Sequence, residues 1–418
     1  MNPVLLFVGL LVLAYLGSIL VGGRAIRGYG LPSGAEYVLL GLLLGPHVLG
    51  VLTRDTLTAF QPLSLVAIGW LALVVGLDYG FVGDRRLRPR VVIGTIGVTL
   101  LSAAITAAAA WFAARRWLGL GGAELWQFAA AAAVVTCETT RHAARWVSER
   151  YGAAGPLTNL MADLGDADDL VPLVLLAALF AVVAAPNLSY PLPWPAWAAI
   201  TLALGAVLGG ACAALLGQTL RSGEVWALLL GAALLGMGLA TRLRFSGMSV
   251  LFALGLVLAL SSPHRAVLRR MLVTTERPVL LPALVLAGAH VQLEASLEWA
   301  LVIGALLVTR LGCKALSAAL LATVSPAARR GGPLMALSLM PAGALTLSMG
   351  LAFALAFPGK MGSLVLAIAV ATALLGEIVG PGALRRALSR AGEIAPAGSA
   401  EIAPPPAETA PSSEVVAS

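Results

Sequence analysis

Long apolar runs recur along the whole chain and are separated by short segments that carry charges, glycine or proline. Most runs are about 20 residues long, which is the length an α-helix needs to cross roughly 30 Å of hydrocarbon. The runs lack the alternation at every second residue that strands of a transmembrane barrel show. The pattern therefore predicts an all-α polytopic membrane protein with about 13 transmembrane helices. The expected spans are residues 3–21, 35–53, 61–78, 91–114, 124–140, 157–185, 194–217, 224–241, 246–262, 279–293, 297–323, 332–356 and 361–383.

Composition and charge agree with a lipid-embedded chain. Hydrophobic residues make up 59% of the sequence and charged residues only 11%, against roughly a quarter charged in soluble domains. The net charge of +7 comes from scattered arginines, so we expect no nucleic-acid partner. Nineteen of the 27 lysines and arginines fall in loops after odd-numbered spans. The positive-inside rule then predicts a multi-pass cell-membrane protein with the N-terminus outside and the C-terminus cytoplasmic.

The composition changes near the C-terminus, where alanine, proline, glutamate and serine replace the apolar runs. Such a segment has too few apolar residues to bury a core. We expect a transmembrane domain over residues 1–386 and a disordered cytoplasmic tail over residues 387–418. No cofactor is expected.

Acidic residues gather in two neighbouring spans. Glu138 lies in the fifth span, and Asp163, Asp166, Asp168 and Asp169 lie near the start of the sixth. A charge at the bilayer centre costs at least about 2.5 kcal/mol, so buried acids are candidate functional residues. Asp168 and Asp169 project about 100° apart on a helix and face different neighbours. We expect Asp163 and Asp166, nearer the membrane edge, to hold helices together or to line the cytoplasmic vestibule.

Two basic residues lie inside the eleventh span. Arg310 and Lys314 are one helical turn apart on one face. Lysine loses its proton on burial far more readily than arginine, so Lys314 suits a position where a charge must switch. We expect an ion pair between Asp168 and Lys314. Arg310 has two open interpretations, as a site residue or as a scaffold residue that reaches toward the membrane surface.

Two spans carry interruptions in corresponding halves of the chain. The fifth is broken by polar residues that include Thr136, Glu138 and Thr139, and the twelfth contains Pro341 and Gly343. Paired interruptions are typical of an inverted-repeat transporter in which two discontinuous helices cross at an ion site. Glu138 is placed to offset the positive N-terminal helix ends that meet there.

On these segments the chain resembles the monovalent cation:proton antiporter-2 family of Kef-type and sodium/proton antiporters. The similar segments, over about residues 1–385, are LLGLLLGPHVLGVL, LVAIGWLALVVGLDYG, ADDLVPLVLLA and RLGCKALSAALLA. The resemblance implies that Asp169 is the ion-binding carboxylate and that Asp168 pairs with Lys314. His47, Cys137-Glu138 and Pro341-Ala342-Gly343 depart from the family pattern, which leaves the transported ion open.

We expect a homodimeric secondary antiporter that exchanges Na⁺ or K⁺ for H⁺ by alternating access. Asp168 and Asp169 would contact the transported monovalent cation. One alternative is a sodium-coupled organic-anion symporter on a similar fold, which would show no proton counterflow. The other is a membrane-embedded prenyl transferase that binds Mg²⁺ through the acids of residues 163–169. Such enzymes usually need a second acidic motif, whereas Asp78 and Glu377 are isolated in the sequence.

Overall fold

The computed structural model describes most of the chain between residues 34 and 394. The described residues are Gly9, Gly34, 36–79, 81–82, 85–87, 89–184, 192–216, 222–262, 265–292 and 296–394. The predicted first span, residues 3–21, lies outside this part apart from Gly9. Residues 395–418 of the predicted tail also lie outside it.

Helices dominate the described residues. They are α2 (Glu36–Leu44), α3 (Arg54–Asp78), α4 (Pro89–Ala113), the π-helical turn η2 (Ala114–Leu118), α5 (Gly122–Cys137), α6 (Arg141–Tyr151), α7 (Pro156–Asp168), α8 (Leu170–Ala184), α9 (Trp194–Leu216), α10 (Ser222–Leu243), α11 (Gly247–Ser261), α12 (Arg265–His290), α13 (Leu297–Val324), α14 (Pro326–Gly331), the 3₁₀ turn η4 (Gly332–Leu334), α15 (Met335–Ser338), α16 (Ala344–Ala356) and α17 (Lys360–Arg390). Two short strands, β1 (Phe81–Val82) and β2 (Arg85–Arg86), pair antiparallel with Phe81 opposite Arg86.

The predicted spans after the first all coincide with helices. Six described helices are long and apolar enough to cross a membrane, and three shorter apolar helical segments accompany them. The sixth predicted span, residues 157–185, is two helices, α7 and α8, which meet at Asp169. The structure thus confirms an all-α polytopic membrane protein.

Two boundaries differ from the sequence prediction. Helix α2 ends at Leu44, well before residue 53, because Pro46 disfavours helical backbone in Gly45 and because Gly50 turns the chain with a φ of 65°. Helix α12 begins at Arg265, whereas residues 265–278 were predicted as a loop. Arginine and leucine are good helix formers, so the helix continues past its apolar part.

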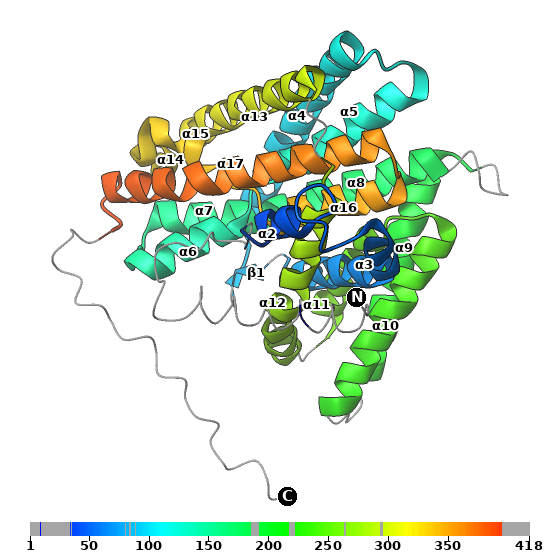
Figure 1. Ribbon diagram of the computed structural model, residues 1–418. Coiled ribbons are helices and arrows are strands. Elements are labelled where there is room, and N and C mark those ends of the chain that lie inside the picture. The colour runs from blue at the N-terminus through cyan, green and yellow to red at the C-terminus, as the bar shows by residue number, and fades with distance from the viewer. Residues whose placement is uncertain are drawn as a thin grey trace, which may run out of the picture.

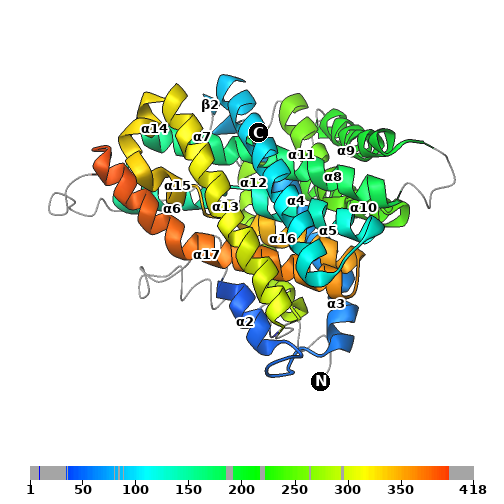
Figure 2. The ribbon, with the colours of Figure 1, turned by 90° about the horizontal axis from the view of Figure 1, so that it is seen from above.

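The helices form two groups. A scaffold bundle contains α2, α3 and α9–α12, and a core bundle contains α4–α8 and α13–α17. Figure 1 shows α13, α15 and α17 above α3, α11 and α12, and Figure 2 separates α13 and α17 from α9 and α10. Scaffold helices α3 and α11 touch through glycines. A Cβ on Gly76 would collide with the backbone at Phe252, and one on Gly255 with the backbone at Leu73. The scaffold is therefore tightly packed.

Candidate functional site at the helix crossing

Two interrupted helices cross inside the core bundle. The chain is extended between α5 and α6, at Glu138–Thr140, and again between α15 and α16, at Pro341–Gly343. The Thr140 amide donates to the Pro341 carbonyl at 3.0 Å, and a Cβ on Gly343 would collide with the Thr140 side chain. The predicted crossing of two discontinuous helices is confirmed.

Helix α13 supplies two cations to this crossing. The Arg310 guanidinium donates to the carbonyls of Thr136, of Glu138 at 2.7 Å and of Met340 at 2.9 Å. The Lys314 ammonium donates to the Cys137 carbonyl at 2.8 Å. These carbonyls have few helical partners because α5 and α15 end there, and a cation also complements the negative end of a helix. Arg310 is only 1% exposed, which places it at the crossing rather than at the membrane surface.

Asp168 and Lys314 do not form the expected ion pair in this conformation. Lys314 completes its contacts with the Thr139 hydroxyl at 2.6 Å. Asp168 accepts a hydrogen bond from the hydroxyl of Thr99 on α4. No ion pair links the two among the residues that the structure describes. The Lys314 ammonium therefore binds the Cys137 carbonyl and the Thr139 hydroxyl at the crossing instead of the Asp168 carboxylate.

Glu138 lies at the first turn of α16. Its carboxylate accepts a hydrogen bond from the hydroxyl of Thr346, and α16 begins at Ala344. A carboxylate is favourable at this positive end of a helix. The electrostatic role of Glu138 stays a prediction.

Asp169 lies at the junction between α7 and α8 and is buried. Within the described parts of the chain, no hydrogen bond or ion pair reaches its carboxylate. The charges of Arg141 and Glu138 nevertheless act on it electrostatically. A buried carboxylate without a partner is costly, so Asp169 stays the candidate residue for binding a proton or a cation.

A network of ion pairs joins the two bundles, and the sequence analysis did not predict it. Arg141, the first residue of α6, is buried and lies 3.0 Å from Asp166 and 3.1 Å from Asp78. Arg269 contacts the other oxygen of Asp78 at 2.6 Å, and Arg145 lies 3.5 Å from Asp166. Asp78, which is isolated in the sequence, therefore has two arginine partners in space. The only sequence signal was an acid at the end of an apolar run and an arginine beside the polar interruption.

The family is shown by comparison with known proteins. Residues 11–387 match the family described as "Sodium/hydrogen exchanger, transmembrane". No curated protein sequence matches the chain. The structure is similar to the sodium proton antiporter MjNhaP1 from Methanocaldococcus jannaschii at pH 8, with a TM-score of 0.67, 16% identity, and coverage of 94% of this chain and 100% of that one. An electron-microscopy map of MjNhaP1 from the same organism gives a TM-score of 0.66 at 19% identity, and the match covers 94% of this chain and 99% of that one. The similarity supports the fold, and the family match, which covers most of the chain, shows that this protein belongs to the transmembrane sodium/hydrogen exchangers.

Proposed function

We propose that this cation:proton antiporter exchanges Na⁺ for H⁺ at Asp169. The family is one of sodium/hydrogen exchangers, so the prenyl transferase alternative, which is an enzyme, and the symporter alternative, which has no proton counterflow, are set aside. The observation that carries the proposal is the buried Asp169 carboxylate, which has no partner among the described residues. The family description and the sodium proton antiporter MjNhaP1 favour Na⁺ over K⁺. Exchange of K⁺ and membership of the Kef-type branch stay predictions from Asp168, Asp169 and Lys314.

The proposed mechanism is competition at one carboxylate. Asp169 cannot hold a proton and a cation at the same time, so loading one releases the other. The core bundle then moves relative to the scaffold bundle and exposes Asp169 to the opposite side. Arg310 and Lys314 keep the crossing intact during this movement because each donates to two or more groups at the crossing.

The Arg141–Asp78 ion pair restrains that movement in our proposal. Asp78 ends scaffold helix α3, and Arg141 begins core helix α6. Both side chains are buried, so the pair must break when the core slides past the scaffold. With the predicted orientation, this contact lies toward the cytoplasm.

Two further proposals concern orientation and assembly. We propose that the N-terminus is outside, that the C-terminus is cytoplasmic, and that the cell membrane is the location. We also propose a homodimer formed through the scaffold bundle, whose tight packing suits a stationary role.

Replacing Asp169 tests the site directly. We expect Asp169→Asn to abolish Na⁺-driven proton movement in proteoliposomes, because an amide neither titrates nor carries charge. Asp169→Glu should keep measurable exchange because it restores a carboxylate. The matched comparison is Asp168→Asn, whose amide oxygen still accepts from Thr99. It removes one carboxylate from the charge balance but leaves Asp169, so it should slow exchange without abolishing it. Wild-type exchange by a well-folded Asp169→Asn protein would show that the site is elsewhere.

Removing the Asp78 carboxylate tests the restraint between the bundles. Loss of one partner from a buried pair costs on the order of 3 kcal/mol, so Asp78→Asn should speed amide hydrogen exchange in α6 and α7. Arg269→Gln is the control, because the Arg269 side chain is 31% exposed and such pairs contribute about 1 kcal/mol or less. Mass spectrometry of peptides from α6 and α7 measures the amide hydrogen exchange of both variants and of the wild type. Equal exchange in Asp78→Asn and wild type would contradict the restraint.

Cysteine labelling tests the orientation. A single cysteine placed within residues 83–90 should react only with a reagent on the cytoplasmic side, and one near residue 190 only with a reagent outside. If both cysteines label from the same side in right-side-out cells, the alternation of the spans is wrong.

A further inference from the structure

A cavity of about 440 Å³ lies between the two bundles. Its apolar lining includes Ile68, Met237 and Met248 of the scaffold and Phe180, Leu355 and Phe357 at the core. Phe180 follows Asp169 by 11 residues along α8, which corresponds to roughly 16 Å of helix. The cavity is therefore separate from the proposed ion site, and its volume lies within the range of small-molecule pockets.

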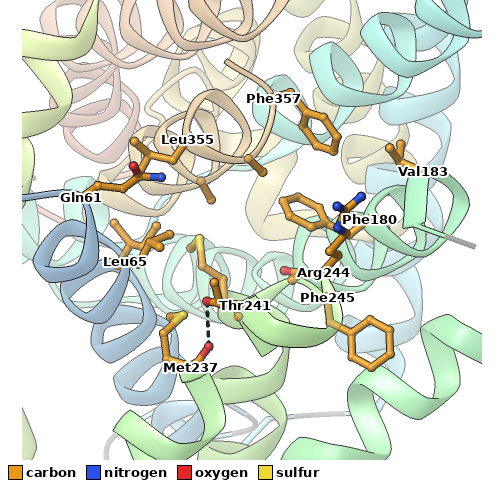
Figure 3. Close-up of a pocket in the computed structure, with 16 residues that line it drawn as sticks. Gln61, Leu65, Phe180, Val183, Met237, Thr241, Arg244, Phe245, Leu355 and Phe357 are labelled. Carbon is orange, nitrogen blue, oxygen red and sulfur yellow. Dashed lines mark hydrogen bonds between the residues drawn. The ribbon is translucent and has the colours of Figure 1, made fainter. Parts of the chain in front are cut away.

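One cation, the exposed Arg244, borders this cavity, whose lining mixes apolar side chains with the polar Gln61, Thr241 and Ser246. Arg244 lines the cavity, and among the described residues it is the only charged one that does so. It has no hydrogen bond or ion pair through its side chain in the described part of the protein. Figure 3 shows Arg244, Phe180 and Phe357 on one side of the cavity and Gln61 and Leu65 across from them.

The backbone at Arg244 is strained. Its φ of 57° is left-handed, the only such value for a non-glycine residue among those described. The turn that ends α10 holds it there, because the Phe245 amide donates to the Ala240 carbonyl at 2.8 Å. Glycine is usual at such a helix end because other residues pay a steric cost there. An arginine kept at a strained position beside a cavity points to a role for its side chain.

We propose that the cavity binds a single-chain fatty acid, with its carboxylate on Arg244 and its tail between the bundles. Guanidinium binds carboxylate through two parallel hydrogen bonds. The rings of Phe180 and Phe357, 5.6 Å apart, would form part of the wall along the tail. The tail would contact both bundles and resist their relative movement, so the fatty acid inhibits exchange. This inhibition rests on the proposed function, whereas binding does not.

Equilibrium dialysis with radiolabelled laurate tests the binding. The protein is held in phosphatidylcholine nanodiscs at pH 8, and binding to empty nanodiscs is subtracted. We expect saturable binding of about one laurate per chain, weakened about tenfold or more by Arg244→Gln through loss of the charged hydrogen bonds. Arg242→Gln is the matched control, because Arg242 is exposed like Arg244 and lies near it in the chain but does not line the cavity. It should bind laurate as the wild type does.

Two further comparisons can overturn the site. Leu355→Trp should block laurate by filling the cavity while leaving Arg244 in place. Unlabelled dodecanol, which has the same tail without the charge, should displace laurate at least about tenfold less effectively than unlabelled laurate. Equal laurate binding by Arg244→Gln and wild type, unchanged binding by Leu355→Trp, or equal displacement by dodecanol would each contradict the proposal.

Isotopic ²²Na⁺ exchange at equal pH on both sides tests inhibition, since proton leak through fatty acids then has no effect. Laurate should inhibit the wild type and Arg242→Gln at similar concentrations, and Arg244→Gln only at about tenfold higher ones. Saturable binding in a protein that moves no Na⁺ would overturn the antiport proposal and leave the laurate site standing. Active Na⁺ exchange without saturable laurate binding would overturn the laurate site and leave the antiport proposal standing.

Discussion

Backbone carbonyls that open inside a membrane must be paired, and this constraint organises the crossing. Helices α5 and α15 end within the core bundle, where lipid cannot satisfy their last carbonyls. Arg310 and Lys314 do so from a single turn of α13. Two buried cations then need anions close by. Glu138, Asp168 and Asp169 supply three carboxylates around the same crossing.

In the proposed mechanism, the ion compensates a surplus of one carboxylate among the acids and bases that lie at the crossing. Among the described residues, Glu138 is held by Thr346 and Asp168 by Thr99, which leaves Asp169 as the acid without a partner. When the two bases and three acids are all ionised, these five side chains carry one net negative charge; they are Arg310, Lys314, Glu138, Asp168 and Asp169. A proton or a monovalent cation on Asp169 would neutralise it. Because either ion serves equally well for charge balance, the two compete, which is the physical basis of the proposed exchange.

The contacts between the bundles are unlike at their two ends. At the end where α3 finishes, Arg141 joins Asp166 of the core to Asp78 of the scaffold. At the other end of α3, near Gln61, the bundles are separated by the cavity that Arg244 lines. Movement of the core against the scaffold would break the Arg141–Asp78 ion pair at one end and change the shape of the cavity at the other. The two ends therefore offer two separate places at which the movement could be restrained.

The sequence predicted the features that depend on local pattern. Apolar run length located the spans, and the interruptions at Glu138 and Pro341 located the crossing, because both are written in consecutive residues. The pairing of Asp78 with Arg141 was out of reach, since it depends on how α3 and α6 pack in space. Lys314 was assigned to Asp168 because the sequence shows side-chain charges and gives no sign of carbonyls competing for them.

The pH dependence of the apparent KM for Na⁺ tests competition at Asp169 most directly. It is measured from initial rates of exchange in proteoliposomes across a range of pH with the membrane potential held at zero. Competition predicts that, where the site is mostly protonated, the apparent KM rises about tenfold for each unit of falling pH while the maximal rate stays constant. An apparent KM that does not change with pH, with only the maximal rate falling, would show that proton and cation bind at separate sites.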